Sequence, residues 1–151
     1  MIFRQEIMDL FTVSDEYFFA HCISADFAMS KGIAVEFNKR YNMKNILQNK
    51  YLDYINQYHY KRMNGDCILE GRVLNLITKE RYYEKPTYAS ITIALEKMRD
   101  ICIKNNISKV AMPKIGCGLD RLKWDKVIGI IMNVFQYTNI EILVCIIGGK
   151  L

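Results

Sequence analysis

The residue pattern best suited to chemistry is a glycine-containing stretch, PKIGCGLDRL, at residues 113–122. Gly116 and Gly118 lack a Cβ and tolerate positive φ angles, so nearby backbone N–H groups can turn inward and form a concave nest for phosphate oxygens. A glycine-bearing turn between a strand and a helix is also common without any ligand. The stretch alone therefore indicates, without establishing, a ligand that carries phosphates.

The elements on either side of this stretch predict how it is held. Residues 108–112 have the composition of a short buried strand, and apolar residues recur at helical spacing between Trp124 and Phe135. The glycine stretch is thus predicted to link a strand to a helix.

The rest of the chain alternates between strand-like and helix-like segments. Strands are predicted at the sheet edge for residues 2–7, in a buried position for 17–23, as a hairpin of 66–69 with 72–77, and in a buried position for 140–147. Helices are predicted from residue 32 with Ser30 as N-cap, over residues 45–58, and from residue 88 with Thr87 as N-cap. This interleaving predicts an α/β fold with a largely parallel central sheet and at least one hairpin.

Two features have both a structural and a functional interpretation. His21 lies inside the buried run at 17–23 and is predicted to be a hydrogen-bonded core histidine in preference to a catalyst. The tyrosines of the 45–58 segment are mixed with basic residues, which fits either a partly buried aromatic stripe or a nucleic-acid-binding face. The buried stripe is the commoner arrangement and is favoured.

The composition predicts one globular domain over residues 1–151, since 51% of the 151 residues are hydrophobic and 25% are charged. The first residues lack the apolar core of a signal peptide, and no run approaches the roughly 18 apolar residues that cross a bilayer. We therefore expect a soluble, cytoplasmic protein without membrane contact. The net charge of +5 is compatible with nucleic-acid binding and does not require it.

The cysteines and histidines give no sign of a metal site. The five cysteines are scattered and form no C-x-x-C pair, so free thiols in a reducing compartment are expected. The two histidines, His21 and His59, are too few for a metal site without carboxylates at ligand spacing. No metal is expected.

Ligands of open α/β sheets bind outside the carboxyl ends of the strands. The segments that follow the buried runs are 24–33, 78–79 and 113–120, and we expect them to converge on one cleft. The chain contains no G-x-x-x-x-G-K-[ST] motif and no G-x-G-x-x-G after its first strand. These absences argue against a nucleoside triphosphatase and a dinucleotide oxidoreductase.

Six blocks of sequence resemble a known family. They are DLF at 9–11, AHCIS at 20–24, GIAV at 32–35, LITK at 76–79, KPTY at 85–88 and MPKIGCGLDRL at 112–122. Together they are similar to the macrodomain branch of the terminal ADP-ribose protein glycohydrolases, also described as O-acyl-ADP-ribose deacylases, over about residues 2–147. The resemblance implies a three-layer α/β/α macrodomain with a mixed, largely parallel central sheet.

The resemblance also implies which residues contact ADP-ribose. The adenine would lie by Asp9 and Leu10, the distal ribose by Ser24 and the loop before Gly32, and the diphosphate on the glycine loop. Lys79 would be the nucleophile and Asp120 its acid/base partner, a combination that marks this branch. The implied ligand contacts are Asp9, Leu10, Ser24, Gly32, Ile33, Thr78, Pro113, Lys114, Ile115, Gly116, Cys117, Gly118, Leu119 and Ile147.

The chain departs from the family pattern at a few positions. Met8 stands where the family usually has a glycine, and Ser30 and Lys31 replace smaller loop residues. Glu80 replaces a second basic residue after Lys79.

The implied chemistry is consistent with the residue types. A neutral lysine amine can form a Schiff base with a sugar that opens to an aldehyde, and a carboxylate can transfer the protons. The resemblance predicts a monomeric hydrolase, without metal or cofactor, that removes ADP-ribose from protein Glu/Asp esters and deacylates O-acyl-ADP-ribose. Two alternatives remain: a non-catalytic reader of ADP-ribose, and a hydrolase of ADP-ribosylated nucleic acid, since related macrodomains serve as antitoxins against DNA ADP-ribosylation.

Overall fold

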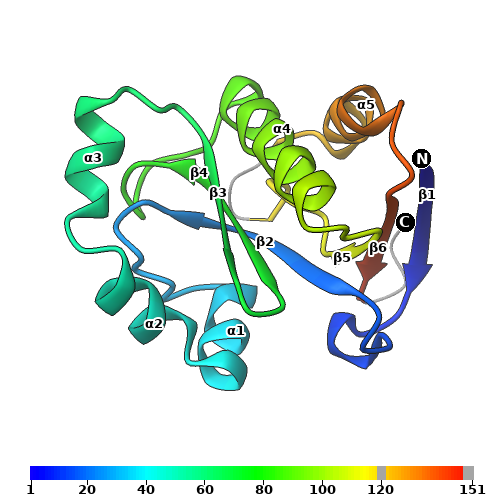
Figure 1. The fold of residues 1–151 in the computed structure, drawn as a ribbon, viewed down its shortest axis with the longest axis horizontal. Coiled ribbons are helices and arrows are strands. Elements are labelled where there is room, and N and C mark those ends of the chain that lie inside the picture. The colour runs from blue at the N-terminus through cyan, green and yellow to red at the C-terminus, as the bar shows by residue number, and fades with distance from the viewer. Residues whose placement is uncertain (119–121, 148–151) are drawn as a thin grey trace.

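A six-stranded sheet in the order β1-β6-β5-β2-β4-β3 forms the centre of the computed structural model, which describes residues 1–118 and 122–147 (Figure 1). Only β3 runs antiparallel, to β4, and the other neighbours are parallel. The predicted edge strand, hairpin and largely parallel sheet are confirmed. The strands are β1 Ile2–Ile7, β2 Phe18–Ser24, β3 Asp66–Glu70, β4 Val73–Lys79, β5 Lys109–Met112 and β6 Glu141–Ile146.

Helices cover both faces of the sheet and complete a three-layer α/β/α arrangement, as predicted. Helices α4 (Tyr88–Lys104) and α5 (Trp124–Phe135) lie on one face, above the sheet in Figure 1. Helices α1 (Ile33–Tyr41), α2 (Met43–Lys50) and α3 (Tyr54–Tyr60) pack with the short 3-10 helix Leu10–Thr12 on the other. No helix within residues 1–118 and 122–147 combines the length and hydrophobicity that a membrane crossing requires.

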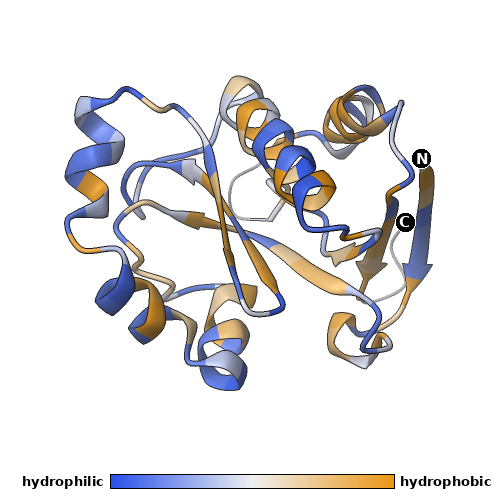
Figure 2. Ribbon diagram, viewed as in Figure 1, coloured by the Kyte–Doolittle hydropathy of each residue, from blue (hydrophilic) through white to orange (hydrophobic). Residues whose placement is uncertain are grey.

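Strands β2, β4, β5 and β6 are largely buried and mainly hydrophobic because the two faces of the sheet contribute to two separate cores, whereas the edge strand β1 is mostly exposed (Figure 2). In β5, Val110 and Met112 pack under α4 and α5, whereas Ala111 between them belongs to the core under α1–α3. Successive side chains of a strand point to opposite faces, so a strand buried on both faces is apolar throughout its length. Burial on both faces therefore explains why these strands appear in the sequence as continuous apolar runs.

His21 is a core histidine, as predicted. Its side chain is fully buried and stacks on Phe37 with ring centroids 4.0 Å apart. Nε2 donates a hydrogen bond to Asn75 Oδ1 at 2.7 Å, whereas Nδ1 has no partner. Burial therefore lowers the pKa of His21 to about 4, because a proton on Nδ1 would be desolvated and unpaired.

Two helix predictions are wrong. The single helix predicted over 45–58 is two helices, because Tyr51 leaves helical geometry at φ −114° and Asp53 is left-handed at φ 61°. The break lets Tyr54 stack on Phe27, with ring centroids 5.2 Å apart. Tyr54 and Tyr58 are buried, so the interpretation of the tyrosines as a buried aromatic stripe is confirmed for these two.

The N-cap of α1 also differs from the prediction. Gly32, and not Ser30, occupies this position, with φ 63° and ψ −149°, a conformation that is essentially restricted to glycine. Thr87 caps α4 as predicted: its side chain accepts a hydrogen bond from Ser90 N at 3.0 Å, and Ser90 Oγ accepts one from Thr87 N at 2.9 Å.

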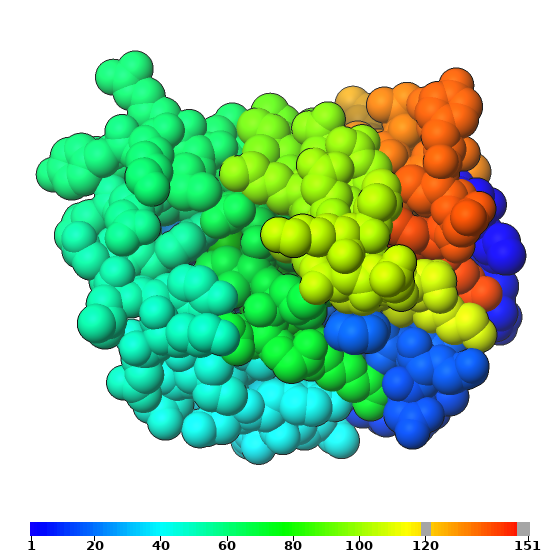
Figure 3. All heavy atoms as spheres, viewed as in Figure 1, coloured from blue at the N-terminus to red at the C-terminus, as the bar shows by residue number. Residues whose placement is uncertain are grey.

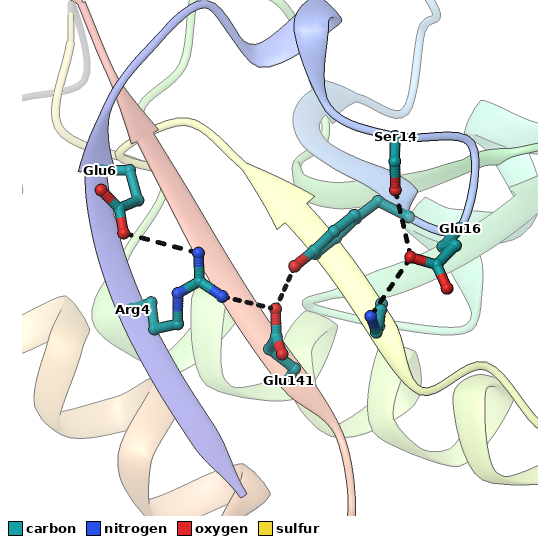
Figure 4. A network of polar contacts seen from close by, with 7 residues as sticks. Arg4, Glu6, Ser14, Glu16 and Glu141 are labelled. Carbon is teal, nitrogen blue, oxygen red and sulfur yellow. Dashed lines mark hydrogen bonds and ion pairs between the residues drawn. The ribbon is translucent and has the colours of Figure 1, made fainter.

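A polar network lies at the end of the sheet where β5 and β6 begin (Figure 4). Glu141 accepts hydrogen bonds from Tyr17 and from Arg4, the latter at 3.5 Å, and so joins β1, β6 and the residue before β2. Next to it, Lys109 pairs with Glu16 at 3.4 Å. Burial and the contact with Glu141 raise the pKa of Tyr17 to about 12, so its hydroxyl stays a donor over the physiological pH range.

Candidate functional site

Five strands end at the same edge of the sheet. The parallel strands β1, β6, β5, β2 and β4 point the same way, so their carboxyl ends at Ile7, Ile146, Met112, Ser24 and Lys79 face one side. The segments that follow these ends must therefore lie near one another.

A cavity of about 550 Å³ opens at this edge. It is bordered by the end of β2 with the loop that follows, by Lys79 with the loop after β4, and by the glycine loop after β5. The structure thus brings together the three segments that the sequence indicated. The lining residues are Cys22, Ile23, Ser24, Met29, Ser30, Lys31, Gly32, Ile33, Ala34, Lys79, Tyr82, Tyr83, Glu84, Lys85, Pro113, Lys114, Ile115, Gly116 and Gly118.

The glycine loop is closed by a hydrogen bond from Leu122 N to the carbonyl oxygen of Gly116, 2.9 Å long. Gly116 has φ +74°, and a Cβ there would lie 3.0 Å from Leu122 Cδ1. Gly116 therefore has the positive φ that the sequence suggested. Gly118 is not among the glycines with a positive φ, and no atom lies within 4 Å of a Cβ placed on it, so its contribution to a phosphate nest stays a prediction.

The loop between β2 and α1 contains three residues with positive φ. Phe27 (φ 55°) and Met29 (φ 47°) are not glycines, and both are buried; Gly32 follows with φ 63°. Positive φ is costly for residues with a Cβ and persists only where the surroundings enforce it. At Phe27 and Met29, burial of the side chains in the core stabilises the positive φ angles.

Asp26 joins this loop to the loop after β4. Its Oδ1 accepts hydrogen bonds from Ser24 Oγ and from Ala28 N, the second at 3.1 Å, and its Oδ2 accepts one from Tyr82 N at 2.9 Å. Asp26 belongs to the segment 24–33, which the sequence predicts to border the cleft, but no role of its own is predicted for it. The hydrogen bond from Ala28 N could have been anticipated, because the side chain of an aspartate in a turn commonly accepts a hydrogen bond from the backbone N–H two residues later. The hydrogen bond from Tyr82 N could not, because Tyr82 is far from Asp26 in the sequence.

Lys79 is positioned by backbone contacts at the end of β4. The register of β2 and β4 shifts between Ile23 and Ser24, so that Ser24 is paired with Lys79. Ala25 N then donates to the carbonyl oxygen of Lys79 at 2.9 Å. The Lys79 residue is half-buried and forms part of the cavity wall, as does the glycine loop.

A second cavity, also of about 550 Å³, adjoins the first. It lies between α3, the end of β4 and the start of α4, and Lys79, Glu84 and Lys85 line both cavities. Thr78 lines only the second, with its hydroxyl buried and without a hydrogen-bond partner. The remaining lining residues are Tyr58, His59, Arg62, Met63, Asn64, Glu80, Thr87 and Ser90.

Several predicted residues lie away from the first cavity. Leu10 is buried in the core, and the Asp9 side chain accepts a hydrogen bond from Phe11 N at 2.9 Å. Ile147 is exposed directly after β6, and Met8 N donates to Ile146 O at 3.1 Å, which keeps the two segments adjacent. Cys117 is half-buried in the glycine loop. Leu119 and Asp120 fall outside the described residues.

The chemistry available here is that of an anion site with a primary amine. Backbone N–H groups of the glycine loop suit phosphate oxygens, and Lys31, Lys85 and Lys114 add positive charge around the same cavity. Among the residues described, no three His, Cys, Asp or Glu side chains are grouped so that they could hold a metal ion.

Comparison with known proteins gives relatives in sequence and in fold. No protein-family model matches the chain. It is 39% identical over 140 residues to the human ADP-ribose glycohydrolase OARD1, covering 90% of this chain and 86% of that protein. The macrodomain of Mycobacterium tuberculosis DarG superposes with a TM-score of 0.77 at 19% identity, covering 99% of both chains. Thermosipho africanus DarTG, solved in complex with ADP-ribose, gives a TM-score of 0.65 at 15% identity, covering 91% of this chain and 39% of that one.

Proposed function

This chain belongs to the macrodomain family of ADP-ribose glycohydrolases, and we propose that it releases ADP-ribose from carboxylate esters of proteins and deacylates O-acyl-ADP-ribose. The family and the three-layer fold that the sequence predicted are both confirmed. The observation that carries the proposal is that Lys79 and the glycine loop line the same cavity. A phosphate-binding backbone and a potential nucleophile are thereby within reach of one ligand.

The bound ADP-ribose would extend along the carboxyl edge of the sheet. The diphosphate lies on the glycine loop, and the distal ribose lies between Lys79 and the loop that ends at Gly32. The adenosine extends toward the ends of β1 and β6, where Asp9, Leu10 and Ile147 lie. Each part of the ligand then meets a separate segment, which favours one binding pose.

In the proposed mechanism, the lone pair of Lys79 Nζ forms a bond to the anomeric carbon of the distal ribose. The bond from that carbon to the ester oxygen breaks, and the carboxylate leaves with the electron pair. Loss of a proton from nitrogen and opening of the sugar ring give an imine, to which water adds. Expulsion of the amine frees ADP-ribose and restores Lys79. Asp120 transfers the protons in these steps.

The test is turnover of a glutamate-ADP-ribosylated peptide by Lys79 variants. Lys79→Ala should abolish release while ADP-ribose binding, measured by calorimetry, persists. Lys79→Arg should be equally inactive, because a guanidinium stays protonated and cannot form the imine. Lys104→Ala, on the exposed end of α4, is the control and should retain activity.

The outcomes separate the possible functions. Undiminished release by Lys79→Ala excludes Lys79 as the nucleophile. An unaltered protein that binds ADP-ribose tightly and hydrolyses none of the ester substrates is a reader module instead. Release from a modified oligonucleotide, with the peptide untouched, moves the substrate class to nucleic acid.

A further inference from the structure

The two cavities at the carboxyl edge meet at Lys79. The first runs from Lys79 toward the glycine loop, and the second runs from Lys79 toward α3 and the start of α4. Glu84 and Lys85, in the loop after β4, line both. A ligand whose reacting atom lies at Lys79 thus has a cavity on either side of that atom.

The proposed reaction requires space on both sides. The anomeric carbon at Lys79 belongs to the distal ribose of ADP-ribose. Its bond to the ester oxygen of the modified residue points away from the rest of the ADP-ribose. The first cavity holds the ADP-ribose, so the target must leave the carbon in another direction. We propose that the second cavity binds the target segment of an ADP-ribosylated polypeptide, namely the modified acidic residue and its neighbours; this inference rests on the proposed function.

The charged groups of the second cavity suit a departing carboxylate. Both acidic residues among the described residues that line it already have a partner: Glu80 pairs with His59 at 2.8 Å, and Glu84 Oε1 accepts a hydrogen bond from Arg81 N at 2.7 Å. Arg62 and Lys85 also line the cavity and can donate to the carboxylate that the reaction releases. The cations therefore complement the charge of the product.

The buried hydroxyl of Thr78 is a second, independent sign of a ligand. Thr78 is only 2% exposed, and its Oγ1 has no hydrogen-bond partner. Buried polar atoms are almost always paired, and an exception calls for an explanation. A carbonyl or carboxylate oxygen of a bound peptide would supply the missing partner.

The mixed charge of the cavity favours a polypeptide over a nucleic acid. Peptide groups offer both donors and acceptors, which match the carboxylates of Glu80 and Glu84 as well as Arg62 and Asn64. A phosphodiester offers only acceptors, so it would leave the acceptor oxygens of Glu80 and Glu84 without a donor from the ligand. The volume of about 550 Å³ lies within the range of small-ligand pockets and suits a short segment.

The experiment compares two substrates that share ADP-ribose and differ in the target group: O-acetyl-ADP-ribose and a glutamate-ADP-ribosylated decapeptide. Arg62→Gln removes a cation from the second cavity alone. Lys61→Gln, at the exposed neighbouring residue, removes the same charge outside either cavity. We expect Arg62→Gln to lower kcat/KM for the peptide about tenfold, the size of a lost charged hydrogen bond. For Arg62→Gln, the turnover of O-acetyl-ADP-ribose and the affinity for ADP-ribose should equal the values measured for the control Lys61→Gln.

A binding arm keeps this test independent of catalysis. Calorimetry on Lys79→Ala, or on the unaltered protein if that hydrolyses nothing, compares the intact ADP-ribosylated decapeptide with free ADP-ribose. The peptide should bind more tightly, and Arg62→Gln in the same background should remove the difference. Equal affinity for the two ligands, or an Arg62→Gln effect no larger than that of Lys61→Gln, would refute the inference. A gain in affinity from a modified oligonucleotide but not from the peptide would also refute it, in favour of nucleic acid.

Discussion

Asp26 is a single residue whose hydrogen bonds bridge the two loops on either side of Lys79. One carboxylate oxygen accepts from the β2–α1 loop and the other from Tyr82 in the loop after β4. Hydrogen bonds to a charged group stabilise by about 1.5–3 kcal/mol, more than neutral ones. The relative position of the two loops beside Lys79 thus depends on the Asp26 side chain.

Asp26→Ala should impair turnover more than ligand binding. With the bridge lost, the loop after β4 is less fixed, and misplacement of a nucleophile by even 1 Å is costly. We expect kcat to fall about tenfold, with the affinity for ADP-ribose changed by less than about threefold. Steady-state kinetics and calorimetry measure the two quantities. The exposed Asp15, replaced by alanine, is the control; equal losses in kcat and affinity for Asp26→Ala would argue against a positioning role.

At the scale of elements, the glycine loop is defined by one backbone conformation. Gly116 has φ +74°, and the chain returns to it through the hydrogen bond from Leu122 N. Left-handed geometry costs an L-residue about 1–2 kcal/mol, and a β-branched side chain more. The conformation of the loop therefore depends on the absence of a side chain at Gly116.

Gly116→Val should weaken ADP-ribose binding by about tenfold or more, because the added Cβ disfavours the positive φ and crowds the loop against Leu122. Calorimetry with ADP-ribose measures the change. Gly129→Ala is the matched control: a Cβ there meets no atom within 4 Å, and alanine favours helix α5. Unchanged affinity in Gly116→Val would mean that the loop does not bind the diphosphate in this conformation.

The elements also show how far sequence reasoning could go. Buried strands, the hairpin and the Thr87 cap were predictable because apolar runs, turn glycines and capping residues act locally. The break between α2 and α3 contains neither glycine nor proline, and the contact that accompanies it, Tyr54 on Phe27, joins residues far apart in the chain. The contact of Asp26 with Tyr82 and the second cavity likewise depend on which strand ends become neighbours. Such partners cannot be identified from one sequence.

At the scale of the whole molecule, His21 makes stability depend on pH. Its pKa is about 4 in the folded protein against 6.5 when exposed, so the unfolded chain binds a proton first as the pH falls. Protonation of His21 in the unfolded chain therefore lowers the free energy of unfolding progressively between about pH 6.5 and pH 4. The total loss is about 3 kcal/mol, and it does not grow further below that range.

Urea unfolding of the wild type and of His21→Gln, followed from pH 7 to pH 4, isolates this term. Glutamine still offers a donor for Asn75 and does not titrate. Carboxylates contribute equally to both proteins, so the stability difference between wild type and variant should shrink as the pH falls. Parallel curves over this range would show that His21 is not the titrating group.

The pairing of β1 with β6 has a consequence for synthesis on the ribosome. Within the described residues, the first strand of the chain pairs only with the last, whereas β2 to β5 find neighbours among themselves. A nascent chain that has emerged only to residue 140 can form the four-stranded part of the sheet, β5-β2-β4-β3. Its first strand, β1, then has no strand to pair with. The edge of the sheet formed by β1 and β6 would then be completed last, and a premature stop before Glu141 would yield a protein that lacks this edge.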